Sequence, residues 1–172
     1  MDLRALIRDI PDFPKPGIVF KDLTPLLLDA RGLDAAVSGL AGPARALGID
    51  YVLGAEARGF ILGAALAREL GVGFIPARRP GKLPHETVAA EYALEYGVNA
   101  LEVHADALGA GARVLVHDDL LATGGTARAL CELVEELGAE VVMCSFLIEL
   151  SFLEGRDRLA PRPVFALIDY AA

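Results

Sequence analysis

Short apolar runs alternate with helical periods over most of the chain. The runs are four to eight residues long and lie at 51–54, 73–77, 113–117, 141–148 and 164–168. Apolar residues at helical spacing lie between or before them, at 33–47, 59–70 and 126–137. Strands of this length that alternate with helices are typical of βαβ units and a buried parallel sheet. The pattern predicts an α/β fold with an open, mainly parallel, doubly wound sheet flanked by helices.

Two regions depart from this alternation. Residues 1–30 precede the first strand of the pattern, and their apolar positions between 3 and 10 predict a short amphipathic helix, followed by an irregular segment at 11–17. Residues 79–106 are polar and lack a helical period, although they lie between two predicted core strands. Insertions of this kind are often lids or binding loops. We therefore expect both regions to contact a substrate.

The length of 172 residues is that of one domain, and no stretch resembles an interdomain linker, so we expect a single domain over 1–172. Apolar residues make up 54% of the chain, yet the longest stretch without Asp, Glu, Lys or Arg is ten residues, 35–44. A membrane-spanning helix needs about 18 apolar residues. The first residues are charged and show no apolar core of a signal peptide. We expect a cytoplasmic protein without a membrane partner.

The formal net charge is −8, whereas nucleic-acid-binding proteins usually present a basic face, so no nucleic-acid partner is expected. A small anion is not excluded, because a local basic cluster suffices to bind it. Cys131 and Cys144 lie in separate apolar segments, where buried small hydrophobes in a reducing compartment are favoured over a metal or redox pair. The three histidines, His85, His104 and His117, are too scattered to predict a zinc site.

The segment 113–127 carries the strongest chemical pattern. A predicted buried strand ends at Asp118 and Asp119, and a loop of small residues then leads into a helix. Open α/β sheets bind ligands at the carboxyl ends of their strands. Gly124 and Gly125 let backbone N–H groups approach an anion at the positive end of the helix. The segment therefore predicts a monophosphate site.

Two familiar phosphate motifs do not occur in the sequence. It contains neither the G-x-x-x-x-G-K-[ST] loop of nucleoside-triphosphate enzymes nor the dinucleotide-binding G-x-G-x-x-G. The carboxylates of Asp118 and Asp119 would repel a bare phosphate. They fit a ligand whose ribose hydroxyls they hold, or one that brings a Mg²⁺ ion near them. A loop with a solvated acidic pair is the alternative.

The segment 118–126 reads DDLLATGGT and resembles the signature for 5-phosphoribosyl-1-pyrophosphate (PRPP) in type I phosphoribosyltransferases. Four further blocks are similar to adenine phosphoribosyltransferases and follow the order of that family, at 13–27, 56–60, 79–84 and 94–97. The resemblance runs from about residue 7 to residue 170. It implies the type I phosphoribosyltransferase fold, with a small N-terminal hood that binds the base over 1–30 and a flexible active-site loop over 80–97.

By this resemblance, the 5′-phosphate of PRPP binds to the glycine-containing loop, at Ala122, Thr123, Gly124, Gly125 and Thr126. Asp118 and Asp119 are then catalytic residues that hold the ribose O2 and O3. The monophosphate site predicted above from the residues alone agrees with that placement.

The pyrophosphate is expected on a basic set formed by Arg58, Arg78, Arg79 and Lys82. Arg58 also counts among the catalytic residues, because the planar fork of an arginine suits a pair of phosphate oxygens. The family often has a non-proline cis peptide in the preceding loop, and we expect one near Ala57.

The flexible loop is implied to close over the reaction centre and to exclude water from a cation-like sugar. Glu95 is the expected catalytic group for proton handling on the purine, with Tyr96 beside it, and His85 is a weaker candidate on the same loop.

The resemblance places adenine against Val19, Phe20 and Lys21. Backbone groups would read the purine edge, the Phe20 ring would stack on the base, and Leu147 would form a wall of the pocket. A polar group left unpaired in such a pocket costs about 1–3 kcal/mol, which favours adenine over a 6-oxo purine. The sequence departs from the family at Lys21, where many relatives carry Arg, and at His117, which we expect to pack beneath the site or at an interface rather than to take part in the chemistry.

The implied reaction converts adenine and PRPP into AMP and pyrophosphate. Mg²⁺ is the expected cofactor, held mainly through the phosphates rather than by a metal site of the protein, and a homodimer is the usual state of the family. Two alternatives stay open: a phosphoribosyltransferase for xanthine or another purine, and a regulatory protein of this fold that senses PRPP or purines.

Overall fold

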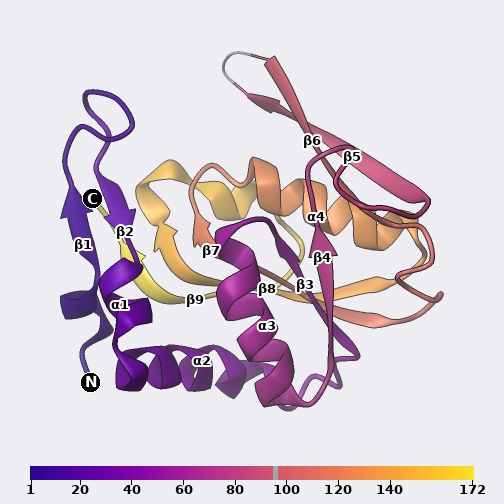
Figure 1. Cartoon of the computed structure of the whole chain (residues 1–172), viewed down its shortest axis with the longest axis horizontal. Helices are drawn as coiled ribbons and strands as arrows, with labels where there is room; N and C mark the ends of the chain where they lie inside the picture. The colour runs from indigo at the N-terminus through magenta and orange to yellow at the C-terminus, as the bar shows by residue number, and fades with distance from the viewer. Residues whose placement is uncertain (95–96) are drawn as a thin grey trace.

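The computed structural model describes residues 1–94 and 97–172, and its centre is a five-stranded parallel sheet (Figure 1). The strand order is β4-β3-β7-β8-β9. The strands are β3 (Tyr51–Ala55), β4 (Gly73–Ala77), β7 (Arg113–Leu121), β8 (Glu140–Leu150) and β9 (Val164–Tyr170). The predicted open parallel sheet is confirmed.

Helices cover both faces of the sheet. They are α2 (Ala30–Ala44), α3 (Arg58–Leu70) and α4 (Gly125–Glu136). Side chains of neighbouring strand residues point to opposite faces. Val52 and Leu115 accordingly belong to a buried cluster with α2 and α3, whereas Leu53 and Val116 belong to a second cluster with α4. The sheet is therefore doubly wound, as the sequence pattern predicts.

The order of the strands reverses between β3 and β7. From β3 the chain crosses through α3 to β4 on one side, and from β7 it crosses through α4 to β8 on the other. Such a switch point opens a crevice at the carboxyl ends of the two central strands. The ends of β3 and β7 are therefore the place where this fold can hold a ligand.

Strand β7 is longer than the predicted segment 113–117. It continues to Leu121 because β8 pairs with it as far as Leu121↔Glu149. Asp118 and Asp119 consequently lie inside the strand rather than in the loop after it. Their backbones are held by the sheet, and only residues 122–124 remain as a connection to α4.

The predicted N-terminal helix over 3–10 is wrong. A 3₁₀ turn is followed by an antiparallel hairpin and a short helix, which are η1 (Leu3–Leu6), β1 (Arg8–Ile10), β2 (Phe20–Asp22) and α1 (Thr24–Leu28). An ion pair of 2.7 Å between Arg8 and Asp22 joins the two strands. The helical spacing of apolar residues fails here because pairing with a distant strand satisfies the backbone instead.

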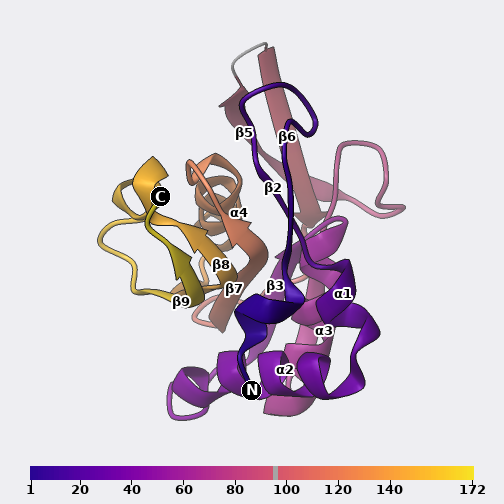
Figure 2. The same cartoon turned by 90° about the vertical axis from the view of Figure 1, so that its left-hand side faces the viewer.

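Residues 79–106 also contain regular structure. Strands β5 (Thr87–Leu94) and β6 (Gly97–His104) form an antiparallel hairpin, so much of the expected loop over 80–97 is strand. Ala90, Leu101 and Val103 are buried at its base in the cluster with α4. This hairpin and the β1–β2 hairpin rise on the same side of the molecule (Figure 2).

The connection between β8 and β9 holds two 3₁₀ turns, η2 (Ser151–Leu153) and η3 (Gly155–Arg158).

Among the described residues, no helix has both the length and the apolar character that a membrane crossing requires.

We expect Leu115→Ala to lower the free energy of unfolding by about 2–5 kcal/mol, because it opens a cavity at a fully buried position of the central strand. Leu28→Ala is the matched control: Leu28 is 82% exposed, and its truncation should change stability by less than about 0.5 kcal/mol. Urea unfolding of both variants checks this. Equal effects of the two substitutions would contradict the assigned core.

Candidate active site

The connection between β7 and α4 forms a cleft of about 210 Å³, lined by Arg58 and by residues 118–127. Gly124 has a φ of +87° and stands at the N-terminus of α4. This conformation is strained for a residue with a side chain. It turns the loop so that the backbone of residues 122–126, predicted as the phosphate loop, lies at the positive end of the helix.

Strand β7 presents its two carboxylates to the same cleft. Asp119 is 4% exposed, and the N–H of Asp119 donates to Asp118 Oδ1 at 2.9 Å. Burial, followed by the negative charge of Asp119, raises the pKa of Asp118 well above its usual value. A Cβ on Gly59 would lie 2.7 Å from Asp118 Oδ1, so the first turn of α3 fits against this carboxylate only with glycine there.

Arg58 connects the two sides of the switch point. Its Nε lies 3.0 Å from Asp119 Oδ2, an ion pair between the first residue of α3 and the end of β7. Asp119 Oδ2 is nevertheless buried without an aligned hydrogen bond among the described residues. The peptide between Glu56 and Ala57, just before α3, is cis, as predicted.

An apolar cavity of about 230 Å³ adjoins Arg58 and is lined mainly by α1 and α3, with Phe20, Leu23, Leu27, Ile61 and Leu62 among its residues. The Arg58 guanidinium lies over the Phe20 ring, 5.0 Å from its centroid. The predicted base-stacking ring and the predicted pyrophosphate-binding arginine are thus brought together. Arg58 lines both cavities and stands between them.

Lys21 and Leu147 are placed elsewhere. Lys21 Nζ lies 2.7 Å from Asp9 and 4.0 Å from the centroid of the Tyr170 ring, because alternation along β2 turns it away from Phe20. Leu147 is fully buried in the cluster with α2 and α3. Val19 is 48% exposed, next to Phe20. Roles of these three residues in base binding stay predictions.

The basic residues after β4 are held by one carboxylate. The N–H of Arg79 donates to Glu56 Oε1 at 2.8 Å, and this bond, with the charges of both arginines, lowers the pKa of Glu56. The guanidinium groups of Arg78 and Arg79 lie 3.3 and 3.5 Å from Glu56. Arg78 in turn donates to the carbonyl of Lys82 at 3.3 Å. Arg78 and Arg79 are therefore grouped at Glu56, just after β3, while Arg58 lies at Asp119 and the role of Lys82 stays a prediction.

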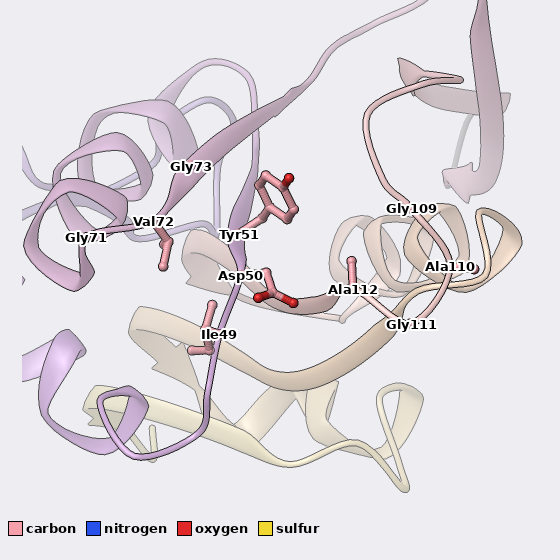
Figure 3. Close-up of a pocket in the computed structure, with 10 residues that line it drawn as sticks. All are labelled: Ile49, Asp50, Tyr51, Gly71, Val72, Gly73, Gly109, Ala110, Gly111 and Ala112. Atoms are coloured by element: carbon pink, nitrogen blue, oxygen red, sulfur yellow. The ribbon is translucent and has the colours of Figure 1, made fainter.

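A larger cavity of about 710 Å³ lies at the opposite ends of the strands, where β3 and β4 begin (Figure 3). It is lined by residues 49–51, 71–73 and 109–112, of which Asp50 alone carries a charge. The Asp50 carboxylate already accepts the N–H of Arg113 at 2.8 Å. The smaller cleft, at the carboxyl ends of the strands, is therefore the one lined by several charged side chains.

Comparisons with known proteins agree with this geometry. The family model described as "Phosphoribosyl transferase domain" matches residues 28–163. Adenine phosphoribosyltransferase of Methylococcus capsulatus is 61% identical, over 98% of each chain. The crystal structure of the enzyme from Thermoanaerobacter pseudethanolicus superposes with a TM-score of 0.96 at 50% identity, over 98% of each chain. The Saccharomyces cerevisiae enzyme, complexed with adenine and an imino-altritol bisphosphate, has a TM-score of 0.92 at 40% identity, over 96% of each chain.

The chain belongs to the adenine phosphoribosyltransferase family. Membership makes it a pentosyltransferase with the type I phosphoribosyltransferase fold. The resemblance that the sequence motifs imply is thereby confirmed.

Of the three predicted loop residues, the structure of this family member describes only His85, which precedes β5. His85 Nε2 lies 3.7 Å from Asp106, and both side chains are exposed. Glu95 and Tyr96 lie outside the described residues. Tyr92, which the sequence analysis did not single out, packs beside the phosphate loop: its Cδ2 would lie 3.7 Å from a Cβ on Gly125. The sequence around Tyr92 does not predict this contact, because the contact depends on how the hairpin packs against the phosphate loop.

Three residues with reactive or titratable side chains, Cys131, Cys144 and His117, lie in the core of this phosphoribosyltransferase. Cys131 and Cys144 are free and buried, with their sulfur atoms 3.4 Å apart. His117 is fully buried beneath the site, as predicted, and its Nδ1 lies 3.0 Å from Ser145 Oγ. Burial lowers the pKa of His117 from 6.5 to about 4.

This pKa predicts a pH dependence of stability. Between about pH 4 and pH 6.5 the unfolded chain binds a proton at His117 that the folded protein does not, so this group makes stability rise with pH. Below about pH 4 and above about pH 6.5 its contribution is constant. The difference in free energy of unfolding between the wild type and His117→Asn should fall by about 3 kcal/mol from pH 7 to pH 4.

Urea unfolding at several pH values checks this difference. Asp118 contributes with the opposite sign, because its pKa is raised on folding, but it is present in both proteins and cancels in the comparison. Parallel pH profiles of the two proteins would contradict a neutral buried His117.

Proposed function

We propose that this protein transfers the 5-phosphoribosyl group of PRPP to adenine and releases AMP and pyrophosphate. The observation that carries the proposal is the Arg58 contact, which joins a carboxylate pair and a phosphate loop on one side to an apolar cavity with an aromatic ring on the other. The names of relatives at 54–61% identity and the adenine bound to the yeast enzyme support the choice of base.

Each part of PRPP has a matching group. The 5′-phosphate accepts hydrogen bonds from the N–H groups of residues 122–126, at the N-terminus of α4. The ribose hydroxyls bind Asp118 and Asp119. The pyrophosphate binds Arg58 together with Arg78, Arg79 and Lys82, which requires Arg58 to exchange its contact with Asp119 for the ligand.

The chemistry follows from the charges of these groups. Glycosyl transfer passes through an oxocarbenium-like state, whose positive charge the carboxylates near the ribose stabilise. The guanidinium groups neutralise the negative charge that develops on the departing pyrophosphate. The reaction as proposed proceeds by direct displacement and assigns no covalent nucleophile.

Mg²⁺ is the proposed cofactor, and the residues of the cleft fit it. Among the described residues no three or more His, Cys, Asp or Glu side chains converge on a potential metal site. Asp119 Oδ2, however, is a buried oxygen without an aligned hydrogen bond, and carboxylate oxygens suit this ion. Mg²⁺ would be held mainly by phosphate oxygens of the substrate, with the Asp119 carboxylate as its nearest group on the protein. When bound, the ion would neutralise charge on the pyrophosphate.

The remaining expectations belong to the same proposal. Residues 1–30 act as the hood over the base, and 80–97 as the loop that closes over the reaction centre, with Glu95 and Tyr96 in proton handling. The protein works as a cytoplasmic homodimer. The free thiols of Cys131 and Cys144 support a reducing compartment, and the exposed Ile61 on α3 supports an interface near the site.

A base panel tests the proposed function. Purified protein with Mg²⁺ and PRPP is offered adenine, hypoxanthine, guanine or xanthine, and pyrophosphate release is measured. We expect release with adenine alone, because the 6-oxo purines leave polar groups of the base pocket unpaired. Consumption of xanthine would indicate the related purine enzyme, and consumption of no base would favour a regulatory protein.

Arg58→Ala should lower kcat/KM for PRPP by about 10- to 100-fold, because it removes charge-assisted hydrogen bonds to the pyrophosphate. Adenine binding should change much less. Arg58→Lys is the matched variant, which keeps the charge and loses the planar fork. Its kcat/KM for PRPP should lie between those of the wild type and Arg58→Ala. Steady-state kinetics with each substrate varied in turn measure both effects. An unchanged kcat/KM for PRPP in Arg58→Ala would overturn the role of Arg58.

A further inference from the structure

The phosphate loop has no cationic side chain of its own. Residues 122–126 supply N–H and hydroxyl groups, while Asp118 and Asp119 place two carboxylates just before them. A phosphate monoester carries nearly two negative charges near neutral pH. The N-terminus of a helix contributes the equivalent of only about half a positive charge. The charge of the bound phosphate therefore needs a partner from elsewhere in the fold.

Arg158 lies beside the loop, although it is 32 positions after Thr126 in the sequence. Its Nη1 would be 3.7 Å from a Cβ on Gly125, and its own Cβ would be 3.3 Å from a Cβ on Gly124. The two glycines are the residues through which the loop enters α4. The Arg158 guanidinium is thus placed at the first turn of the helix, where the phosphate is expected.

A close backbone contact determines this placement. A Cβ on Gly155 would collide with the carbonyl oxygen of Ala122, and a Cβ on Gly124 would lie 2.5 Å from that of Gly155. No side chain fits between η3 and the loop at these points. The 3₁₀ turn that carries Arg158 is therefore held directly against the phosphate loop.

Two arginines near Arg158 in the sequence are held in ion pairs, whereas Arg158 has no ion-pair partner among the described residues. Arg156 is paired with Glu149 at 2.7 Å, and Arg162 is paired with Glu135 at the same distance. In the described part of the chain, Arg158 forms no ion pair or side-chain hydrogen bond, and it is exposed to solvent. An anion in the loop can therefore bind this guanidinium without displacing an ion pair to any of the described residues.

We propose that Arg158 is a binding residue for the 5′-phosphate of the ribose and sets the preference of the cleft for phosphorylated over unphosphorylated ligands. This inference rests on the proposed function, because it assigns the phosphate to residues 122–126. It adds a side chain from η3 that pairs with the phosphate oxygens while the backbone of the loop orients them.

Binding measurements with ligands that differ only in the phosphate test the role of Arg158. Isothermal titration calorimetry compares AMP with adenosine, and ribose 5-phosphate with ribose, on the wild type and on Arg158→Gln. We expect AMP and ribose 5-phosphate to bind about 10- to 100-fold more weakly to Arg158→Gln, the range for loss of a charge-assisted hydrogen bond. Adenosine should bind equally to both proteins. In turnover, KM for PRPP should rise more than kcat falls.

Two further variants act as controls. Arg158→Lys keeps the charge and should recover part of the affinity. Arg68→Gln removes the same charge from an exposed arginine in the last turn of α3, at the other end of that helix from Arg58. It should change AMP binding by less than about twofold, because distant surface charges are screened. Thermal unfolding of all variants verifies that they fold.

Three outcomes would overturn the proposal: equal effects of Arg158→Gln and Arg68→Gln on AMP binding, an equal loss of adenosine and AMP affinity in Arg158→Gln, or no binding of ribose 5-phosphate to the wild type. The proposed function fails on a different result. A wild type that binds ribose 5-phosphate but consumes no adenine would refute the transferase activity, while the comparison of phosphorylated ligands would still decide the role of Arg158.

Discussion

Parallel pairing of β3 with β7 is the constraint on which the candidate site depends. The two strands run in register from Tyr51↔Val114 to Gly54↔His117, and the chain leaves them through helices on opposite faces. Their ends thus lie side by side while α3 and α4 begin next to each other. Glycine permits the close fit: a Cβ on Gly54 would lie 2.9 Å from the carbonyl oxygen of Gly59. A larger residue there would push α3, and with it Arg58, away from Asp119.

Charge in this acidic protein is organised around the same crevice. Glu56 holds the two arginines that follow β4, and Asp119 holds Arg58. These contacts position cationic groups that would otherwise repel one another. In the proposed function, an anionic ligand would replace a carboxylate as the partner of these arginines. The net charge of −8 therefore describes the protein as a whole but not the local field of the cleft.

Most of the fold was predictable, and the errors have a common cause. Strand β4 has the predicted bounds, and the three long helices begin within three residues of the predicted positions. The predicted helix at residues 3–10 is wrong, because this segment holds a 3₁₀ turn and the first strand of an antiparallel hairpin, and the pattern did not predict the hairpin within 79–106. A three-residue strand or a polar hairpin shows little hydrophobic periodicity in its sequence. Its backbone hydrogen bonds are made by a partner strand, and its side chains pack against another element of the fold.

The sequence alone determined the groups that lie in one continuous segment: the carboxylates of β7, the loop after them and the first turn of α4. Local backbone geometry suffices to place these groups, since a strand, a glycine turn and a helix follow one another without interruption. Only the tertiary structure decided which distant side chains complete the cleft. Arg58 meets Asp119 and Arg158 meets Gly125 through the order of strands and the contact of η3 with the loop. Such contacts depend on the packing of whole elements, which spacing along the chain does not encode.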